Sequence, residues 1–513
     1  MNDSCNTPWA PYTNDQLKEA TGEMLTHVAL LFIFLNLVRS DTTVVIDASV
    51  EFGTWEGFGT SLAWWAKAFG SRSDLADVFF TTNLVHFTGS HNQQHEVPGL
   101  GMNIVRYNVG ATSYTPAPNG DVMKPSPNIR PSREVDSFWL NWYNNDPTSN
   151  SWDWTRDSNQ RQMLLMAKDR GVNRFELFSN SAPWWMLKNH NPSGGENGRG
   201  NLQNWDYDSF VQYLTTVAKW YKDQHGVQWT SIEPFNEPSS YWWTPTGDQE
   251  GCHIDWVSMS EIVPNLRKKM DENDLRDVLL SNADENNYDM SIATWPEISD
   301  EARDNIGRIN SHGYSGTGGN RVGLYNISVD AKLKVWMSEY GDGNEDGATM
   351  ARSIMYDFYY LRAVGWVYWQ VLDESKWGLI DANNDDLSLS GPHNKYFTLA
   401  QFSRHVRPGM KIISTTSDVT VAAYSREENL LVLIAMTDVP NTFTFDLSAV
   451  PGVYKKAERW TTTFDDKKRY FKEEPLQVTD KILKDSLEAN SMKTWELRGS
   501  SPQLYRPSPI VYE

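Results

Sequence analysis

The sequence predicts an α/β protein in which a (β/α)8 barrel, of the TIM-barrel type, is followed by a side β-sandwich. From about residue 55 to residue 405, eight short apolar runs alternate with stretches whose apolar residues recur at helical spacing. After Arg407-Pro-Gly409 the pattern changes to short runs that alternate apolar and polar residues, which is typical of antiparallel strands. The length of 513 residues suits one large domain plus a smaller one.

The elements of the barrel can be assigned in order along the chain. The eight strands are predicted at residues 55–61, 102–107, 174–179, 230–235, 277–281, 307–312, 334–338 and 364–369. Amphipathic helices are predicted at residues 160–170, 207–224, 261–272 and 348–361. Residues 115–150, rich in Pro, Asn and Ser, are predicted to be a long loop. Active residues of such a barrel follow the carboxyl ends of its strands.

The C-terminal region, residues 408–513, is predicted to form the sandwich. Its strands are expected at residues 411–415, 419–424, 430–436, 442–447, 455–462, 471–478 and 494–498. Thr43–Val50 also has the pattern of a strand and precedes the barrel. We therefore expect residues 43–54 to pair with the side β-structure, and residues 55–407 to form the catalytic barrel.

Residues 1–42 are interpreted as an N-terminal extension with a signal-peptide-like segment. The apolar run Val28–Val38 is too short to span a bilayer as a helix but has the length of a signal-peptide core. The residues before it are acidic, which is the wrong charge for the start of a signal. A start of translation at Met24 would resolve this, and the protein would then be secreted to the extracellular space. The alternative is a membrane-anchored or cytosolic protein with a buried hydrophobic start.

Composition excludes several classes of function. A net charge of −20 argues against binding to nucleic acid or to an anionic membrane, which both need an excess of Lys and Arg. No His pair has the spacing of zinc ligands, so no metal site is predicted. The 23 Trp residues are an unusually large set, and their flat apolar faces suit sugar rings as well as a core. The acidic composition fits a secreted enzyme that acts on a neutral polysaccharide, and it fits a need for solubility alone equally well; we expect the protein to be a monomer.

Two glutamates are predicted to carry the chemistry. Glu237 follows Asn236 at the end of the fourth strand, and Glu339 ends the seventh. Glycoside cleavage needs a carboxylic acid that protonates the leaving oxygen, and a retaining mechanism needs a second carboxylate about 5–5.5 Å away as nucleophile. Strands four and seven face each other across the barrel, so the pair can meet in one cleft.

Other strand ends supply candidate substrate-binding residues. Arg106 is expected to hold Glu339 ionised, and Asn236 to hydrogen-bond the 2-hydroxyl of the sugar. His312 and Tyr314 follow strand six, Tyr314 as a donor to the nucleophile, and Trp369 after strand eight is expected to form the floor of the sugar site.

Three Trp doublets at loop positions suggest platforms for sugar rings. In each doublet we expect one ring in the core and one in the cleft, and the pattern does not decide which; the candidates for the cleft are Trp65, Trp184 and Trp242. Asp284 and Glu285, after strand five, are expected either to touch substrate or to cap a loop.

At these residues the chain resembles glycoside hydrolase family thirty, specifically its fungal endo-β-1,6-galactanase group. The matching stretches are Gly57–Trp65, Asn103–Asn108, Phe178–Met186, Phe235–Pro238, Glu250–His253, His312–Tyr314, Ser338–Asp342 and Trp366–Trp369. The resemblance implies a (β/α)8 barrel with an attached side β-structure. It also implies endo-acting double displacement on β-1,6-galactan, the side chain of arabinogalactan, with Glu237 as acid/base and Glu339 as nucleophile. It implies no cofactor.

Two rival functions stay open at this point. The first is another activity of the same family, such as a β-1,6-glucanase or a xylanase, because galactose and glucose differ only in the orientation of the 4-hydroxyl. The second is a carbohydrate-binding pseudoenzyme, against which the presence of both Glu237 and Glu339 argues.

Overall fold

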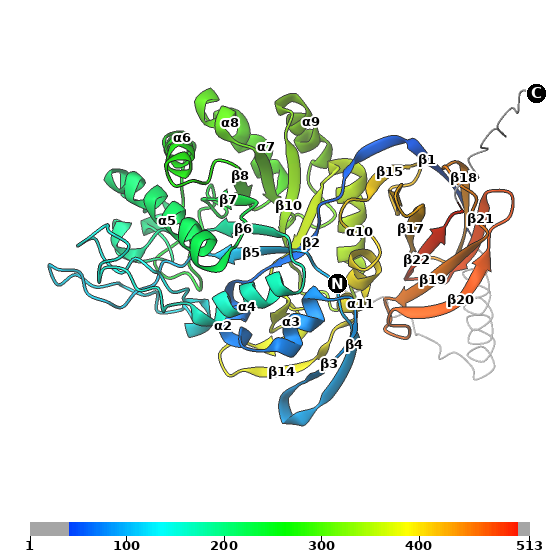
Figure 1. Ribbon diagram of the computed structural model, residues 1–513, viewed down its shortest axis with the longest axis horizontal. Helices are drawn as coiled ribbons and strands as arrows, with labels where there is room; N and C mark the ends of the chain where they lie inside the picture. Colours follow the sequence, from blue (N-terminus) through cyan, green and yellow to red (C-terminus); the bar gives the residue numbers. More distant parts are fainter. Residues whose placement is uncertain (1–39, 501–513) are drawn as a thin grey trace, which may run out of the picture.

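The computed structural model describes residues 40–500, which form a closed barrel and a large sheet side by side (Figure 1). The barrel consists of eight parallel strands in the order β10-β11-β2-β5-β6-β7-β8-β9. They are β2 (Gly57–Ser61), β5 (Ile104–Asn108), β6 (Arg174–Phe178), β7 (Ser231–Glu233), β8 (Leu279–Glu285), β9 (Arg308–His312), β10 (Lys334–Tyr340) and β11 (Gly365–Tyr368). The predicted barrel and its eight strands are confirmed.

Helices surround the barrel. They are α2 (Ala63–Phe69), α3 (Ser73–Phe80), α4 (Ser158–Asp169), α5 (Tyr207–His225), α6 (Trp256–Glu272), α7 (Tyr288–Thr294), α8 (Asp300–Asn305), α9 (Arg321–Ala331), α10 (Ala348–Tyr356) and α11 (Asn394–Ser403). In α5 the apolar face predicted from the sequence is buried, and the helix ends at Gly226, whose φ of 62° requires a residue that tolerates the left-handed region. The helix predicted at 348–361 is α10 followed by a π-helical turn, Asp357–Leu361.

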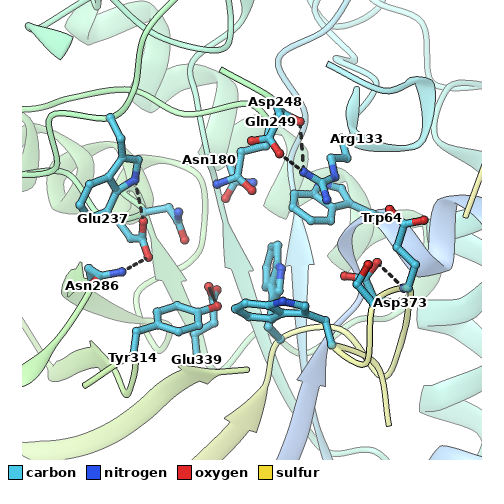
Figure 2. Close-up of a pocket in the computed structure, with 16 residues that line it drawn as sticks. Trp64, Arg133, Asn180, Glu237, Asp248, Gln249, Asn286, Tyr314, Glu339 and Asp373 are labelled. Carbon is cyan, nitrogen blue, oxygen red and sulfur yellow. Dashed lines mark hydrogen bonds and ion pairs between the residues drawn. The ribbon is translucent and has the colours of Figure 1, made fainter. Parts of the chain in front are cut away.

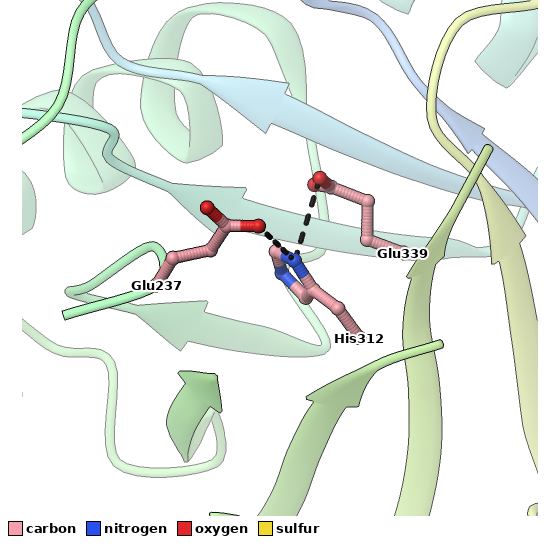
Figure 3. Close-up of side chains that lie close together, drawn as sticks. All are labelled: Glu237, His312 and Glu339. Atoms are coloured by element: carbon pink, nitrogen blue, oxygen red, sulfur yellow. Dashed lines mark hydrogen bonds and ion pairs between the residues drawn. The ribbon is translucent and has the colours of Figure 1, made fainter. Parts of the chain in front are cut away.

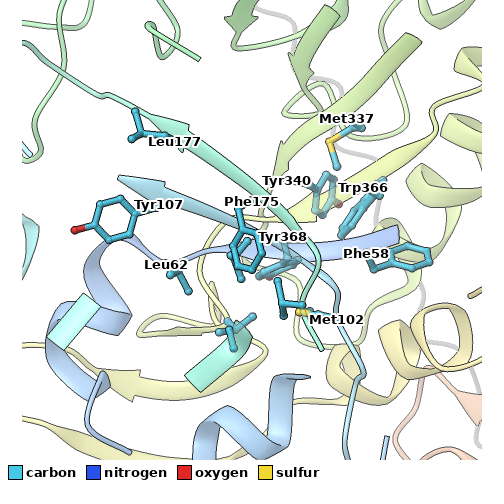
Figure 4. Packing of buried hydrophobic residues seen from close by; sticks show 14 of the residues in the cluster. Phe58, Leu62, Met102, Tyr107, Phe175, Leu177, Met337, Tyr340, Trp366 and Tyr368 are labelled. Atoms are coloured by element: carbon cyan, nitrogen blue, oxygen red, sulfur yellow. The ribbon is translucent and has the colours of Figure 1, made fainter. Parts of the chain in front are cut away.

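Alternate residues of the barrel strands face different surroundings. Phe175, Leu177, Trp366 and Tyr368 pack with other apolar side chains in the main hydrophobic core (Figure 4). The interior of the barrel instead holds polar groups: Arg106 of β5 donates to Glu176 of β6 (2.9 Å), and Arg308 of β9 pairs with the same carboxylate. The carboxylate of Glu176 is thus paired with two cations, which offsets the cost of burying these charges.

The side structure is a nine-stranded sheet in the order β20-β19-β22-β17-β16-β15-β1-β18-β21. Its strands are β1 (Ser40–Thr54), β15 (Lys411–Thr415), β16 (Thr420–Ser425), β17 (Leu430–Thr437), β18 (Asn441–Ala449), β19 (Lys456–Thr463), β20 (Phe471–Gln477), β21 (Ile482–Leu487) and β22 (Ser491–Arg498). The sheet folds over itself, because Phe445 of β18 contacts Trp495 of β22 with ring centroids 4.9 Å apart. The two halves enclose a second apolar core, as expected of a sandwich.

The first described strand ties the two parts together. β1 pairs antiparallel with β15 and parallel with β18, so the segment that precedes the barrel lies in the middle of the C-terminal sheet (blue among orange and red in Figure 1). β1 begins at Ser40, three residues before the predicted position. The prediction of a signal-like segment falls on residues 1–39, which lie outside the described residues, as do residues 501–513.

Shorter elements complete the description. Small sheets are formed by β3 (Leu84–Thr88) with β4 (Gln94–Pro98), and by β12 (Leu372–Asp373) with β13 (Ile380–Asn383) and β14 (Ser388–Pro392). Short 3-10 turns lie at Ser90–Asn92, Pro131–Arg133, Trp184–Met186, Glu196–Gly198, Asn204–Asp206 and Trp295–Glu297. The predicted long loop at 115–150 contains one of these turns and isolated bridges. Within residues 40–500 no helix combines the length and apolarity needed to cross a bilayer.

Candidate active site

A cavity of about 590 Å³ opens at the carboxyl ends of the barrel strands (Figure 2). Loops that follow several different strands contribute to it. Its lining comprises Trp64, Arg133, Asn180, Asn236, Glu237, Trp242, Asp248, Gln249, Asn286, Tyr314, Glu339, Trp369, Asp373, Glu374, Ser375 and Trp377. The two predicted catalytic glutamates therefore share one cavity.

Glu237 sits in a turn just past β7 and has a φ of 47°, in the left-handed region. Its backbone is held there, because its N–H donates to the carbonyl of Asp284 (2.9 Å) and its carbonyl accepts from the indole of Trp243 (2.9 Å). Its carboxylate accepts from the amide of Asn286 (2.8 Å) and the indole of Trp242 (3.2 Å). The turn thus aims the side chain into the cavity at the expense of backbone strain.

Glu339 lies in β10, which β8 and β9 separate from β7, the strand before Glu237, so, contrary to expectation, strands four and seven are not directly opposite. One of its oxygens accepts from Arg106 (2.7 Å), and the other accepts from the hydroxyl of Tyr314 (2.9 Å). Burial raises the pKa of Glu339, while the positive charges of His312 and Arg106 act to lower it. The predicted contacts of Arg106 and Tyr314 with this carboxylate are present.

His312 lies between the two glutamates (Figure 3). Its Nδ1 is 3.2 Å from an oxygen of Glu237 and 3.5 Å from an oxygen of Glu339, and its Nε2 is 3.2 Å from Asp284. Burial by itself would lower the pKa of His312, but the charges of Glu339 and Asp284 raise it well above its ordinary value. We therefore treat His312 as cationic at neutral pH.

The two carboxylates are close enough for a covalent mechanism. One oxygen of Glu237, one of Glu339 and a nitrogen of His312 all lie within 4.8 Å of one another. A retaining glycosidase needs its two carboxyl groups about 5–5.5 Å apart, whereas an inverting one needs roughly 6.5–9.5 Å to admit a water. Oxygens of the two glutamates that lie within 4.8 Å of one another are consistent with the shorter separation. These three groups could also hold a metal ion, but each already has a partner in the network.

Comparison with known proteins places the chain in a family. The sequence profile of O-glycosyl hydrolase family 30 matches residues 41–315. An endo-β-1,6-galactanase from Hypocrea rufa is 42% identical over 473 residues, which cover 91% of this chain and 97% of that protein. The chain belongs to O-glycosyl hydrolase family 30.

Solved structures agree with this family 30 enzyme in fold. A conserved exported protein from Bacteroides fragilis superposes with a TM-score of 0.71 at 22% identity, covering 89% of this chain and all of the other. The catalytic domain of a family 30 xylanase C from Talaromyces cellulolyticus gives a TM-score of 0.64 at 19% identity with the same coverage. At these identities the likeness concerns the barrel and side sheet alone.

The Trp doublets of this family 30 chain place their rings in the cavity and the core differently from the prediction. Trp242 lines the cavity while Trp243 is buried, as expected. In the first doublet the prediction is wrong: Trp65 is fully buried against Phe79, with its indole donating to the carbonyl of Ser61 (2.7 Å). Its neighbour Trp64 lines the cavity instead, because successive residues of the short helix α2 point to different sides.

In the remaining doublet neither ring reaches the cavity. Trp184 and Trp185 are both buried, and their indoles donate to the carbonyls of Leu140 and Trp139 in the long loop. The prediction that Trp184 binds substrate is therefore wrong, and this doublet anchors a loop.

The other predicted binding residues fall into two groups. Asn236, Tyr314 and Trp369 line the cavity, whereas Arg106 and His312 lie beneath it and contact the carboxylates. Asp284 and Glu285 do not line it. Asp284 pairs with Arg106, and the positive charge of Arg106 opposes the effect of burial so that the pKa of Asp284 falls to about 2. Glu285 accepts from Ser239 (2.5 Å) and Thr294 (2.7 Å) and so caps a loop.

Sequence reasoning missed several lining residues. Asn286 and Asn180 carry no charge and lie in ordinary loop sequence, although Asn180 stands two positions after the third strand, where functional residues occur. Arg133 comes from the long loop, and its guanidinium lies 4.4 Å from the centre of the Trp64 ring. No local sequence pattern would place a residue of that loop over the first strand.

Proposed function

We propose that this chain is a retaining endo-β-1,6-galactanase in which Glu339 is the nucleophile and Glu237 the general acid/base. The observation that carries the proposal is the close pair of carboxylates in one cavity, with oxygens no more than 4.8 Å apart. The substrate follows from the relative in Hypocrea rufa, which is named for this activity and aligns over 91% of the chain.

In the first step Glu339 attacks the anomeric carbon of the galactosyl residue, and the bond to the leaving oxygen breaks. Glu237 gives its proton to that oxygen, so the rest of the chain leaves as an alcohol while a galactosyl ester forms on Glu339. Arg106 and Tyr314 hold the attacking carboxylate in place.

In the second step Glu237 acts as a base. It takes a proton from water, the resulting oxygen attacks the anomeric carbon, and Glu339 leaves as a carboxylate, so the stereochemistry of the starting linkage is kept. His312, placed between the two groups, favours a negative charge on either of them.

Substrate contacts fit the same assignment. The side-chain oxygen of Asn236 is buried and has no hydrogen-bond partner among the described residues, so it is free to accept from the 2-hydroxyl. Trp64 and Trp369, with ring centroids 5.2 Å apart, offer apolar faces for the sugar rings.

Glu237→Gln should lower kcat/KM on β-1,6-galactan by about 10²–10⁴-fold, because a general acid contributes that much. Glu339→Gln should abolish turnover, since no covalent step remains.

Purified enzyme should be incubated with β-1,6-galactan, β-1,6-glucan and glucuronoxylan, and the products sized. Internal cleavage of galactan by the wild type is the expected result. Activity on glucan but not galactan would refute the substrate assignment. Binding without any turnover in the wild type would instead favour a pseudoenzyme.

We also propose that the mature protein is a secreted monomer that acts without membrane attachment. The support is the signal-like run that follows Met24 and the strongly acidic composition. Sequencing the N-terminus of protein purified from the native culture medium tests this. A product that retains Asn2 or Asp3 would contradict cleavage of a signal that starts at Met24.

A further inference from the structure

We infer that Asn180 recognises the orientation of the 4-hydroxyl of the sugar in the innermost glycone site and thereby makes the enzyme select galactosyl over glucosyl residues. This rests on the proposed function, to which it adds the residue that determines sugar specificity.

Asn180 has the environment of a ligand-binding group. Asn180 is 3% exposed and lines the cavity. Its side-chain oxygen has no hydrogen-bond partner among the described residues. The hydroxyls on either side of it are turned to the backbone: Ser179 donates to the carbonyl of Ser181 (2.9 Å) and Ser181 to that of Ala182 (3.5 Å). A buried polar group left without a partner costs about 1–3 kcal/mol, so this amide is built for a partner that arrives with the substrate.

The barrel topology places Asn180 opposite the nucleophile. Asn180 follows β6, the third strand of the barrel, and Glu339 lies in β10, the seventh, and these strands are diametrically opposed in the closed order of eight. In Figure 2 Asn180 points into the cavity from the side opposite Tyr314 and Glu339. Carbon 4 of a pyranose lies across the ring from the anomeric carbon. We place the sugar ring with its anomeric carbon at Glu339 and its 4-hydroxyl toward the wall that carries Asn180.

Three other polar groups of the cavity, those of Asn236, Trp64 and Arg133, are less suited to this role. Asn236 adjoins Glu237 and so lies near the anomeric end of the ring. The indole N–H of Trp64 is also without a partner, but it can only donate, and Arg133 covers its ring. The guanidinium of Arg133 is itself paired with Asp248 (2.5 Å).

A side-chain amide can distinguish the two epimers because it offers an acceptor and a donor in fixed directions. Its oxygen can accept from an axial 4-hydroxyl while its N–H donates to a neighbouring hydroxyl. An equatorial 4-hydroxyl points elsewhere and leaves the buried oxygen unpaired. Sites built to hydrogen-bond a substrate hydroxyl discriminate strongly for this reason.

The test compares kcat/KM for β-1,6-linked galactotetraose and β-1,6-linked glucotetraose in the wild type, Asn180→Leu and Asn180→Ala. Asn180→Leu is close to isosteric and removes both polar atoms. We expect it to lower kcat/KM on the galactotetraose by about 10- to 100-fold, the range of one lost hydrogen bond, with less than about a threefold change on the glucotetraose. The matched control is Gln224→Leu, the same kind of change at an exposed position of α5 outside the cavity, which should leave the ratio of the two values unaltered.

The outcomes separate the two proposals. A ratio that stays constant in both Asn180 variants, with an unchanged thermal midpoint and an active wild type, would overturn the role of Asn180 alone. An equal fall of the ratio in Gln224→Leu and in Asn180→Leu would do the same. A wild type that prefers the glucotetraose would overturn the proposed function itself.

Discussion

At the scale of single residues, the site depends on balancing charges in a buried space. His312 contacts Glu237, Asp284 and Glu339, and Arg106 contacts Asp284, Glu339 and Glu176. Two cations thus stabilise the ionised forms of several carboxylates. Without these cations, burial would favour the neutral form of each carboxyl group. The nucleophile must be ionised to attack, so these cations set the lowest pH at which the enzyme works.

His312→Asn should move the acidic limb of the kcat/KM profile to higher pH by about one unit. The charge of His312 lowers the pKa of Glu339, so its removal raises that pKa, and a higher pH is needed to ionise the nucleophile. The measurement is the pH dependence of kcat/KM on β-1,6-galactan. The control is His86→Asn, at an exposed histidine of β3, which should leave the profile unchanged. A uniform loss of activity with an unmoved acidic limb would contradict this role.

The proposed catalytic pair could be predicted from sequence because residues at the carboxyl ends of barrel strands point into the same barrel mouth. Which Trp of each doublet faces the cavity could not be predicted, because two adjacent Trp residues differ only in the side of the backbone from which the ring projects. That side is decided by what packs nearby, such as Phe79 against Trp65. A neutral side chain such as Asn180 gives no chemical signal until burial shows that its oxygen is unpaired.

At the scale of elements, one buried carboxyl joins the two loops that form a wall of the cavity. Glu250 is fully buried, and its Oε1 accepts from the hydroxyl of Thr112 (2.6 Å) and the N–H of Val135 (3.1 Å) in the long loop after β5. Its chain neighbours Asp248 and Gln249 line the cavity. Burial raises the pKa of Glu250 to about 8, so the carboxyl is neutral in the folded protein over much of the working range.

Stability should therefore fall as the pH rises from about 4.5 to about 8, on the order of 5 kcal/mol for this shift. The folded state keeps the proton of Glu250 over this range and the unfolded state has released it, so rising pH favours unfolding. Glu250→Gln imitates the protonated form and should be more stable than the wild type at pH 8.5 but equal to it at pH 4.

Thermal midpoints of both proteins, measured at a fixed scan rate across that range, provide the check. Glu261→Gln, on the exposed side of α6, should behave as the wild type does. Parallel curves for the wild type and Glu250→Gln would show that Glu250 is not the group responsible.

Predicted and observed elements differ where the pattern is weak. Strand β21 was not predicted, because its centre, Lys484-Asp485-Ser486, is polar and the strand pairs only at the sheet edge with β18. Most of the remaining strands of the side structure have buried apolar positions that make their patterns readable, although β20, which was predicted, has no buried residue. Pairing partners, by contrast, are not encoded locally, and the central place of β1 in the sheet follows from contacts with residues several hundred positions away.

At the scale of the whole molecule, the barrel and the side sheet share one core. All ten residues of α11 are buried, because the helix lies between the barrel and the sheet. Gln401 donates to the hydroxyl of Thr462 (2.8 Å), and Asn394 donates to the carbonyl of Thr463 (2.9 Å). The main apolar cluster likewise continues from the barrel into strands β16 and β17.

The protein should therefore unfold as one cooperative unit despite its two parts. We expect a single calorimetric transition whose calorimetric and van't Hoff enthalpies agree, and coincident curves from near-UV and far-UV circular dichroism. Ile46→Ala, in the fully buried part of β1, should lower the midpoint of that one transition, since such truncations cost about 2–5 kcal/mol. Two separated transitions, with only one of them shifted by Ile46→Ala, would contradict a shared core.

The left-handed backbone at Glu237 links the stability of the folded protein to its catalytic rate. A non-glycine residue in that region stores about 1–3 kcal/mol, and here the residue concerned is the proposed general acid/base. The strain lowers the free energy of unfolding of the protein in order to orient a single side chain. Selection for catalysis alone would keep the strained backbone at Glu237. Selection for a long lifetime of the folded chain would favour an unstrained backbone there.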